Sequence, residues 1–211
     1  MSNTFKPILF STPMVQAILN GTKTQTRRII KPQPKEGYLP KIHTDHFGKR
    51  YLESRKSAIE LEYIDWKFYQ IGDILWVRET FGKLVTDDSF CYAADVCCPK
   101  YDKPFFGWKP SIHMPKEAAR IFLKVTNVRC ERLNDITEAD AIAEGIEKTS
   151  IAPFVHRYKN YLVKQKLTSP ISSFKTLWMK INGLESWEEN PYVWVYDFEV
   201  IEKPLDFLSH E

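Results

Sequence analysis

Hydrophobic residues recur along this chain in patterns that predict short strands around a few helices. The clearest strand is predicted over 119–132, where Ile121 and Leu123 begin an alternation of period two. A short amphipathic helix is predicted over 13–20, because hydrophobic residues recur there at helical spacing and Gly21 follows as a stop. The same patterns predict further strands over 7–10, 24–30, 71–81, 90–94 and 192–202, and further helices over 135–145, 153–166 and 171–181. This mixture predicts an α+β fold, a small mixed β-barrel with flanking helices.

The length of 211 residues favours one domain, residues 1–211, with large loops. Residues 31–40 are broken by proline and are expected to form a loop, and 41–70 are expected to be an insertion. The stretch 86–118 contains four Pro and three of the four Cys with little periodicity, which favours loop structure.

The charge balance narrows the classes of partner. Thirty Lys and Arg oppose 27 Asp and Glu, a net charge of +3 that does not predict tight nonspecific binding to a polyanion. A nucleic-acid site would therefore need locally concentrated basic residues. No apolar run approaches the ~18 residues that span a bilayer, and the N-terminal segment shows no signal-peptide pattern. A cytoplasmic protein with no membrane partner, and with reduced thiols, is expected.

The densest polar cluster is GTKTQTRR, residues 21–28, directly after the predicted helix. Lys23 would supply a positive charge, a threonine hydroxyl would act as a nucleophile or donor, and Arg27 or Arg28 would hold a phosphate or a carbonyl. The alternative from residue types alone is a solvated basic end of a strand.

The order of motifs favours the functional interpretation. A helix, then G-x-K-x-x-T-x-R, then G-D-x-L-x-V-x-E at 72–79, then a long strand and a capped helix resembles the ASCH domain of the PUA-like superfamily. The longer stretches ILFSTPMVQAILNGTKTQTRR, GDILWVRETF, WKPSIHMP and NPYVWVYDFEV resemble a phage and prophage branch of that family. The resemblance extends over about 8–30, 71–82, 91–146 and 174–200.

This resemblance implies a cleft that faces RNA or a modified nucleoside. Some compact ASCH proteins are amidohydrolases that remove the acetyl group from N4-acetylcytidine with a Lys, a Thr and a Glu. By position in the motifs, these catalytic residues correspond to Lys23, Thr26 and Glu144. The chain is about twice as long as those hydrolases, with insertions near 31–70, 86–118 and 147–170. Such insertions would narrow, enlarge or block the cleft.

Elementary chemistry gives the three residues their roles. A threonine hydroxyl needs a base, and a lysine serves as one only where burial or a neighbouring cation depresses the pKa of its amine. Glu144 ends a predicted helix, where the macrodipole disfavours negative charge, as suits a proton donor to the leaving amine. Residues three apart on a regular strand point to opposite faces, so Lys23 and Thr26 share a site only if 22–26 contains a turn or a bulge.

Other candidates for substrate or RNA binding surround this trio. Arg27, Arg28 and Lys31 form a basic patch, and Glu79, Lys109 and His113 are further residues that could line the cleft or serve only as structural hydrogen-bonding groups. Cys97 and Cys98, with Cys91, fit no common zinc spacing, so neither a metal nor a cofactor is expected.

Three functions therefore remain open. The first is an amidohydrolase acting on an acylated nucleoside, and the second is a noncatalytic RNA-binding module of the same fold. The third is a phage accessory or interaction protein with a remnant cleft, which the large insertions suggest.

Overall fold

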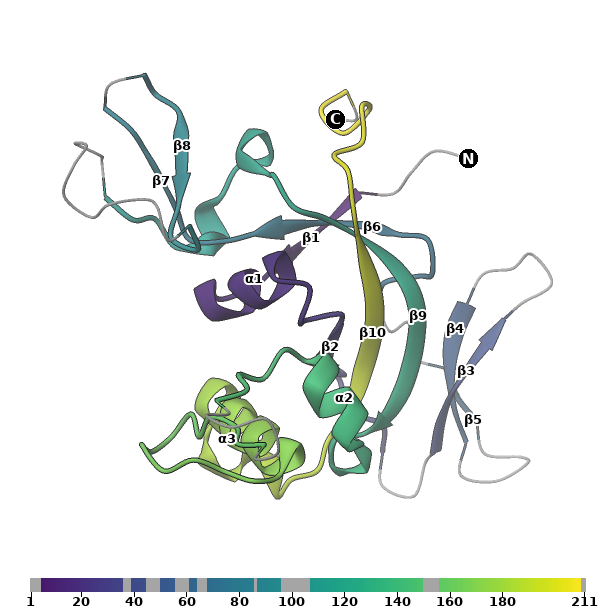
Figure 1. Cartoon of the computed structure of the whole chain (residues 1–211). Helices are drawn as coiled ribbons and strands as arrows, with labels where there is room; N and C mark the ends of the chain where they lie inside the picture. Colours follow the sequence, from purple (N-terminus) through teal and green to yellow (C-terminus); the bar gives the residue numbers. More distant parts are fainter. Residues whose placement is uncertain are drawn as a thin grey trace. The chain divides into compact units, whose positions relative to one another are not determined.

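The computed structural model describes residues 5–35, 39–44, 50–55, 61–63, 68–85, 87–95, 107–149 and 156–209. Strands are β1 Phe5–Leu9, β2 Gln25–Ile29, β3 Leu39–Thr44, β4 Arg50–Arg55, β5 Leu61–Tyr63, β6 Ile74–Arg78, β7 Phe81–Lys83, β8 Phe90–Tyr92, β9 Phe122–Arg132 and β10 Tyr192–Ile201. Helices are α1 Thr12–Leu19, α2 Glu138–Ala143 and α3 Pro170–Asn182, with 3₁₀ turns η1 Ser111–His113, η2 Lys116–Ala118, η3 Leu133–Asp135 and η4 Leu184–Trp187. The fold class is therefore mixed α+β (Figure 1).

The main sheet has five strands in the order β1-β6-β9-β10-β2 and is mostly antiparallel. Strands β1 and β6 pair in parallel. Strands β3, β4 and β5 form a separate antiparallel meander, and β7 pairs with β8. The expected barrel is not closed, because no pairing among the described residues joins the outer strands β1 and β2.

Contacts divide the chain into two compact units. Unit 1 comprises Met1–Lys23, Gly72–Thr126 and Phe198–Glu211, and unit 2 comprises Thr24–Ile71 and Asn127–Asp197. The long strands β9 and β10 each contribute residues to both units.

Unit 1 is built on apolar side chains of β6, β9 and the C-terminal segment. Phe207 is fully buried and contacts Phe5, Trp76 and Phe122 through ring edges and tilted faces. Pro13 lies in the first turn of α1, a position where proline needs no amide donor. Four residues of α1 are buried, Met14, Val15, Ala17 and Ile18. The amphipathic pattern therefore forms the helix that the sequence predicted.

Unit 2 holds α2 and α3 beside the antiparallel pair β2–β10 (Figure 1). Helix α2 begins with a capping box, in which the Thr137 hydroxyl accepts from the Asp140 amide and the Asp140 carboxylate accepts from the Thr137 amide. Helix α3 buries Phe174, Leu177 and Trp178 on one face. Trp178 and Trp194 are both buried in the core.

Two regions differ from the sequence prediction. The predicted helix over 153–166 is wrong where it is described, because 156–166 has no helical turn and Tyr158 instead forms isolated β-bridges with Lys148 and Leu167. The stretch 31–40, expected to be a loop, contains the start of β3, and the insertion 41–70, for which no elements were predicted, contains the rest of the β3–β4–β5 meander. These strands are short and carry charged residues, so their hydrophobic alternation is weak.

Candidate functional site

Lys23 lies in the turn between α1 and β2. Helix α1 ends at Leu19, Gly21 follows with a left-handed φ of 70°, and the Lys23 amide donates to the Ala17 carbonyl at 3.0 Å. Strand β2 begins only at Gln25. Strand alternation therefore does not separate Lys23 from Thr26, and the Lys23 side chain is buried, 2% exposed. The division between the two units falls directly after Lys23.

Thr26 and Glu144 belong to unit 2, and two contacts link their segments. The Thr24 amide donates to the Ala143 carbonyl at 2.9 Å, which ties the chain before β2 to the end of α2. Arg27 Nη1 lies 3.3 Å from Glu144 Oε1. Thr26 and Glu144 are each 4% exposed. A hydroxyl and a carboxylate far apart in sequence are therefore both buried near the same edge strand.

The pleat of β2 sends its polar residues to two faces. Thr26 pairs with Tyr196 of β10, and Arg28 pairs with Trp194, so these four residues share one face. Burial lowers the pKa of the Arg28 guanidinium from its ordinary value, although Tyr69, Glu144 and Tyr196 act in the opposite direction.

The end of the 31–70 insertion contacts this face. Phe68 stacks on Trp194 with ring centroids 4.3 Å apart, and Tyr69 meets Tyr196 edge-on at 5.0 Å. The Tyr69 amide also donates to the Tyr196 hydroxyl at 3.4 Å. Trp194 is therefore an internal aromatic partner of Phe68 as the chain is folded here.

Arg27 faces the other side of β2, among carboxylates. Its side chain has no exposed surface. Its partners are Glu131 at 2.6 Å, Asp140 at 3.4 Å, Glu144 at 3.3 Å and the Gln25 side-chain oxygen at 2.5 Å. From the sequence, Arg27 and Arg28 were expected to belong to one basic patch. Successive residues of a strand point to opposite faces, so the two arginines have different surroundings. Arg27 supports Glu144 from inside the protein and presents no surface to a ligand.

Unit 1 holds three further predicted residues around the end of β6. Glu79 is 1% exposed, and its amide donates to the Met114 sulfur. Lys109 is exposed and its backbone pairs with Phe81. His113 is exposed at the end of η1. Lys31, in unit 2, is exposed just after β2.

Arg120 was not predicted as a site residue from the sequence, although it is the main partner of Glu79. It binds Glu79 with two hydrogen bonds, Nε–Oε1 at 2.8 Å and Nη2–Oε2 at 3.0 Å, and also binds Asp95. Its guanidinium lies 3.8 Å from the Tyr92 ring centroid. Burial raises the pKa of Glu79 above its ordinary value, and the Arg120 hydrogen bonds oppose that rise without cancelling it. No local sequence pattern links Asp95 or Tyr92 to Arg120, so these contacts could not be predicted from the sequence.

The thiols show no sign of a metal centre in the described part of the chain. Neither Cys91 nor Cys130 forms a disulfide among the described residues, which also contain no group of three or more His, Cys, Asp or Glu that would hold a metal. Cys97 and Cys98 lie outside the described residues. Among the helices that the structure describes, none combines the length and apolar character needed to cross a membrane.

Known proteins provide no significant match to this chain. No protein-family model matches it. No curated protein and no solved structure matches it significantly either. The residues of this chain are therefore the basis for inferring its function.

Proposed function

We propose that this chain is an amidohydrolase of the ASCH type, within the PUA-like superfamily, that deacylates N4-acetylcytidine or a similar acylated base in a nucleoside or RNA. Thr26 is the nucleophile, Lys23 is its base and Glu144 is the proton shuttle. The observation that carries the proposal is the burial of Thr26 and Glu144, together with the electrostatic interaction of Glu144 with Arg28, which shares the Thr26 face of β2. Buried nucleophiles and carboxylates beside charged partners are typical of catalytic sites.

The first half of the reaction transfers the acyl group. The Lys23 amine takes the Thr26 hydroxyl proton as Thr26 Oγ1 attacks the amide carbonyl carbon. When the tetrahedral intermediate collapses, the carbon–nitrogen bond breaks and protonated Glu144 gives its proton to the leaving amine. The free base departs, and the acyl group remains as an ester on Thr26.

The second half regenerates the protein. The Glu144 carboxylate takes a proton from water as the water oxygen attacks the ester carbon. The ester bond to Thr26 breaks, and Lys23 returns the proton to Thr26 Oγ1. A carboxylic acid is released, and all three groups recover their starting protonation. Arg28 shares a face of β2 with Thr26, so its guanidinium is the nearest cation in the strand for an oxyanion.

The direct test is release of cytidine and acetate from N4-acetylcytidine by the purified chain, followed by chromatography. Thr26→Val keeps the shape of the side chain and removes the hydroxyl, so kcat should fall at least ~10³-fold, as expected for loss of a nucleophile. The kcat of Lys23→Met and of Glu144→Gln should fall by a similar factor. Circular dichroism and Tm show whether each variant remains folded.

Thr24→Val is the matched control. Thr24 is exposed two residues before Thr26, and its link to Ala143 is made by the backbone. Its kcat should stay within about twofold of the unchanged chain. Absence of turnover on a panel of N-acylated bases, or full activity in Thr26→Val, would overturn the hydrolase proposal.

A noncatalytic accessory role is the second candidate, and one observation favours it. Phe68 and Tyr69 of the insertion pack on Trp194 and Tyr196, on the face of β2–β10 that carries Thr26. If this packing blocks substrate, Phe68→Ala should create activity that the unchanged chain lacks. Turnover by the unchanged chain would exclude the accessory role as its sole function.

A further inference from the structure

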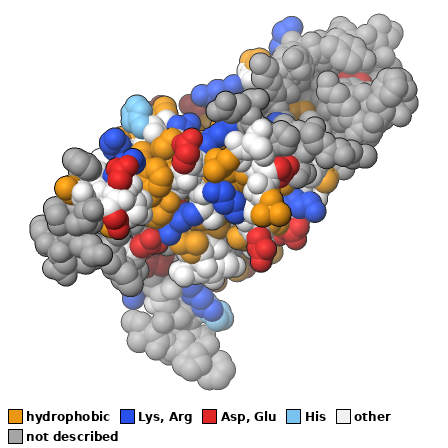
Figure 2. All heavy atoms as spheres, turned by 90° about the horizontal axis from the view of Figure 1, so that it is seen from above, with side chains coloured by type: hydrophobic (Ala, Val, Ile, Leu, Met, Phe, Trp, Pro, Cys, Tyr) orange, Lys and Arg blue, Asp and Glu red, His pale blue; other side chains and the backbone are white. Residues whose placement is uncertain are grey.

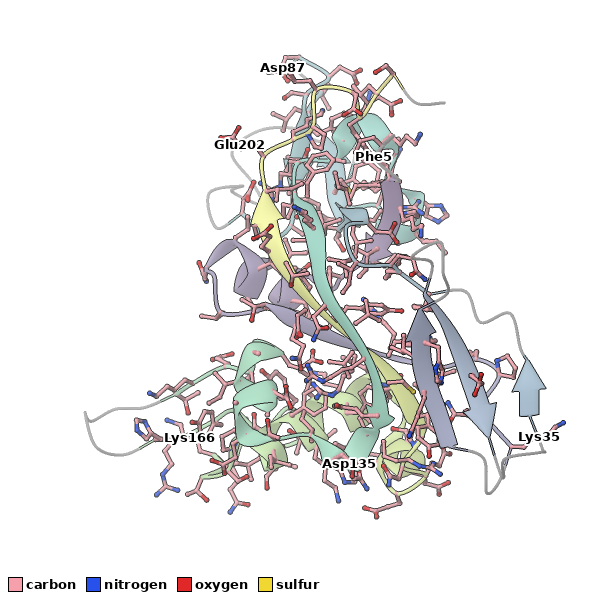
Figure 3. The ribbon with its side chains drawn as sticks, turned by 90° about the vertical axis from the view of Figure 1, so that its right-hand side faces the viewer. Phe5, Lys35, Asp87, Asp135, Lys166 and Glu202 are labelled. Carbon is pink, nitrogen blue, oxygen red and sulfur yellow. The ribbon has the colours of Figure 1, made fainter. Side chains whose placement is uncertain are left out.

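The segment after Glu144 forms a pocket that no part of the proposed mechanism uses. It has a volume of about 440 Å³, within the range of small-ligand pockets, and lies in unit 2. Figure 3 labels Lys166 on this segment. The lining residues are Glu147, Thr149, Lys159, Asn160, Tyr161, Leu162, Val163, Lys164, Gln165 and Lys166.

The lining is cationic. It contains three lysines and one glutamate, so its formal charge is 3 − 1 = +2. Lys159 is already paired with that glutamate, Glu147, at 2.5 Å. Lys164 and Lys166 are exposed, and no carboxylate among the described residues pairs with either of them. Two ammonium groups at one pocket are therefore available to an anion.

Tyr161 adds a neutral hydrogen-bond donor. Its hydroxyl oxygen accepts from the Glu147 amide at 2.9 Å, and its own amide donates to Thr176 Oγ1 at 3.1 Å, so the side chain and the backbone are both held in place. Burial raises the pKa of the Tyr161 phenol, which keeps its O–H proton at neutral pH. That proton is directed to no acceptor among the described residues.

The walls of the pocket are held by backbone hydrogen bonds. Tyr158 forms β-bridges to both Lys148 and Leu167, which join the two ends of the segment. Asn160 Oδ1 accepts from the Leu162 and Val163 amides at 3.0 and 3.1 Å, which fixes the turn that carries the following lysines. The cations therefore project from an ordered turn.

The short chain segment between Glu144 and Glu147 limits the distance between this pocket and the proposed catalytic carboxylate. Glu147 follows Glu144 by three residues, and three residues span at most ~11 Å when fully extended. One wall of the pocket therefore begins within that distance of Glu144, inside the same unit.

We infer that this pocket binds a phosphate of the RNA chain beside the acylated nucleotide, so that the substrate is an oligoribonucleotide and not a free nucleoside. The inference rests on the proposed function. Lysine ammonium groups bind phosphate as point charges, and two of them with a phenol donor suit its several oxygens. Leu162 and Val163 add apolar surface at the same pocket.

The test measures binding of a short unmodified oligoribonucleotide by fluorescence anisotropy, which needs no turnover. Lys164→Met combined with Lys166→Met should weaken binding about tenfold. The slope of log affinity against log salt should decrease by roughly 0.7 for one lost phosphate contact on a single strand. The control is Lys175→Met combined with Lys180→Met on α3, which removes the same charge outside the pocket lining. It should change affinity less than twofold.

The outcomes separate this inference from the proposed function. Equal losses in the two double variants, or no loss in either, would overturn the phosphate site. Tighter binding of polyglutamate than of RNA would also overturn it, since the surface would then fit an acidic protein. RNA binding through the pocket without hydrolysis would overturn only the enzyme. Equal kcat/KM on free N4-acetylcytidine and on an oligonucleotide containing it would overturn only the phosphate site.

Discussion

Each unit contains a cluster of bonded charges around one buried centre, and the two centres have opposite charge. In unit 1 the hidden group is the Glu79 carboxylate, 1% exposed, and its partner Arg120 keeps 27% of its side chain exposed. In unit 2 the hidden group is the Arg27 guanidinium, with no exposed surface, and its partners Glu131 and Asp140 keep 19% and 16%. Arg120, Glu131 and Asp140 therefore remain partly in water, whereas Glu144, the third carboxylate at Arg27, keeps only 6% of its side chain exposed.

The difference lies in how many partners each buried ion needs. A carboxylate is satisfied by one bidentate guanidinium, and Arg120 alone supplies both hydrogen bonds to Glu79. A guanidinium has five donors, so Arg27 draws on several acceptors, and its Nε still has no hydrogen-bond partner in the structure. Loss of the central residue should therefore leave more unbalanced charge in unit 2 than in unit 1.

The largest expected effect comes from Arg27→Met. The substitution removes the buried cation that Glu131, Asp140 and the nearly buried Glu144 share, and removing one partner of a buried ion pair costs about 3–5 kcal/mol. Arg129 still pairs with Glu131 and Asp140, so Glu144 is the carboxylate most affected. Urea unfolding at pH 7 measures the loss in free energy of unfolding. A loss under 1 kcal/mol would show that the three carboxylates need no buried cation.

Lys175→Ala is the control in the same unit. Lys175 pairs with Glu188 at 2.8 Å, but both side chains are well exposed, at 38% and 74%. Exposed pairs contribute about 0–1 kcal/mol, so this variant should remain close to the unchanged chain.

The sequence predicted the elements that support these clusters better than the clusters themselves. Strand β9 and helix α3 carry strong hydrophobic periodicity, and both were predicted within three residues of their bounds. Clusters such as Glu79–Arg120 join residues 41 apart, and pairing at that separation leaves no local pattern. Strand alternation predicts opposite faces for Arg27 and Arg28, but the bound of β2 and its partner strand must be known first.

The catalytic candidates were predictable only in part. The glycine stop at Gly21 and the start of β2 beyond Lys23 follow from local residue types. The burial of Glu144 depends on the Thr24–Ala143 hydrogen bond and on Arg27, which are long-range contacts. Periodicity in short windows contains no information on such contacts.

Arg120→Met should have the intermediate effect, about 2–3 kcal/mol at pH 8, because it leaves Glu79 as a buried carboxylate without its bidentate partner. The guanidinium lowers the pKa of Glu79, so its removal should raise that pKa further. A raised folded-state pKa gives stability that is present below the ordinary value of 4.5 and is lost as pH rises through the folded-state value. The deficit should therefore be smaller at pH 5 than at pH 8.

The double variant that combines Glu79→Gln with Arg120→Met tests whether ionisation of Glu79 causes this pH dependence. The amide cannot ionise, so the double variant should lose the extra pH dependence that separates Arg120→Met from the unchanged chain. Parallel stability curves for the single and the double variant between pH 5 and pH 8 would assign the loss to packing of Arg120 on Tyr92 instead.

Asp140→Asn should give the smallest effect and the opposite dependence on pH. Burial acts to raise the pKa of Asp140, but hydrogen bonds from Thr137 and Gln25 and the charge of Arg129 outweigh it and hold the pKa at about 2. A depressed folded-state pKa gives stability that is present above the ordinary value of 3.8 and is lost as pH falls toward about 2. The variant should therefore be less stable by about 1 kcal/mol at pH 7, after allowance for screening by solvent.

In urea titrations the difference should shrink below pH 3.8, whereas Glu138→Gln, an exposed change on the same helix, should show no comparable trend. If the loss of stability in Asp140→Asn stayed constant from pH 7 to pH 2.5, its cause would be the lost capping box. The negative charge of Asp140 would then not contribute to stability through Arg27.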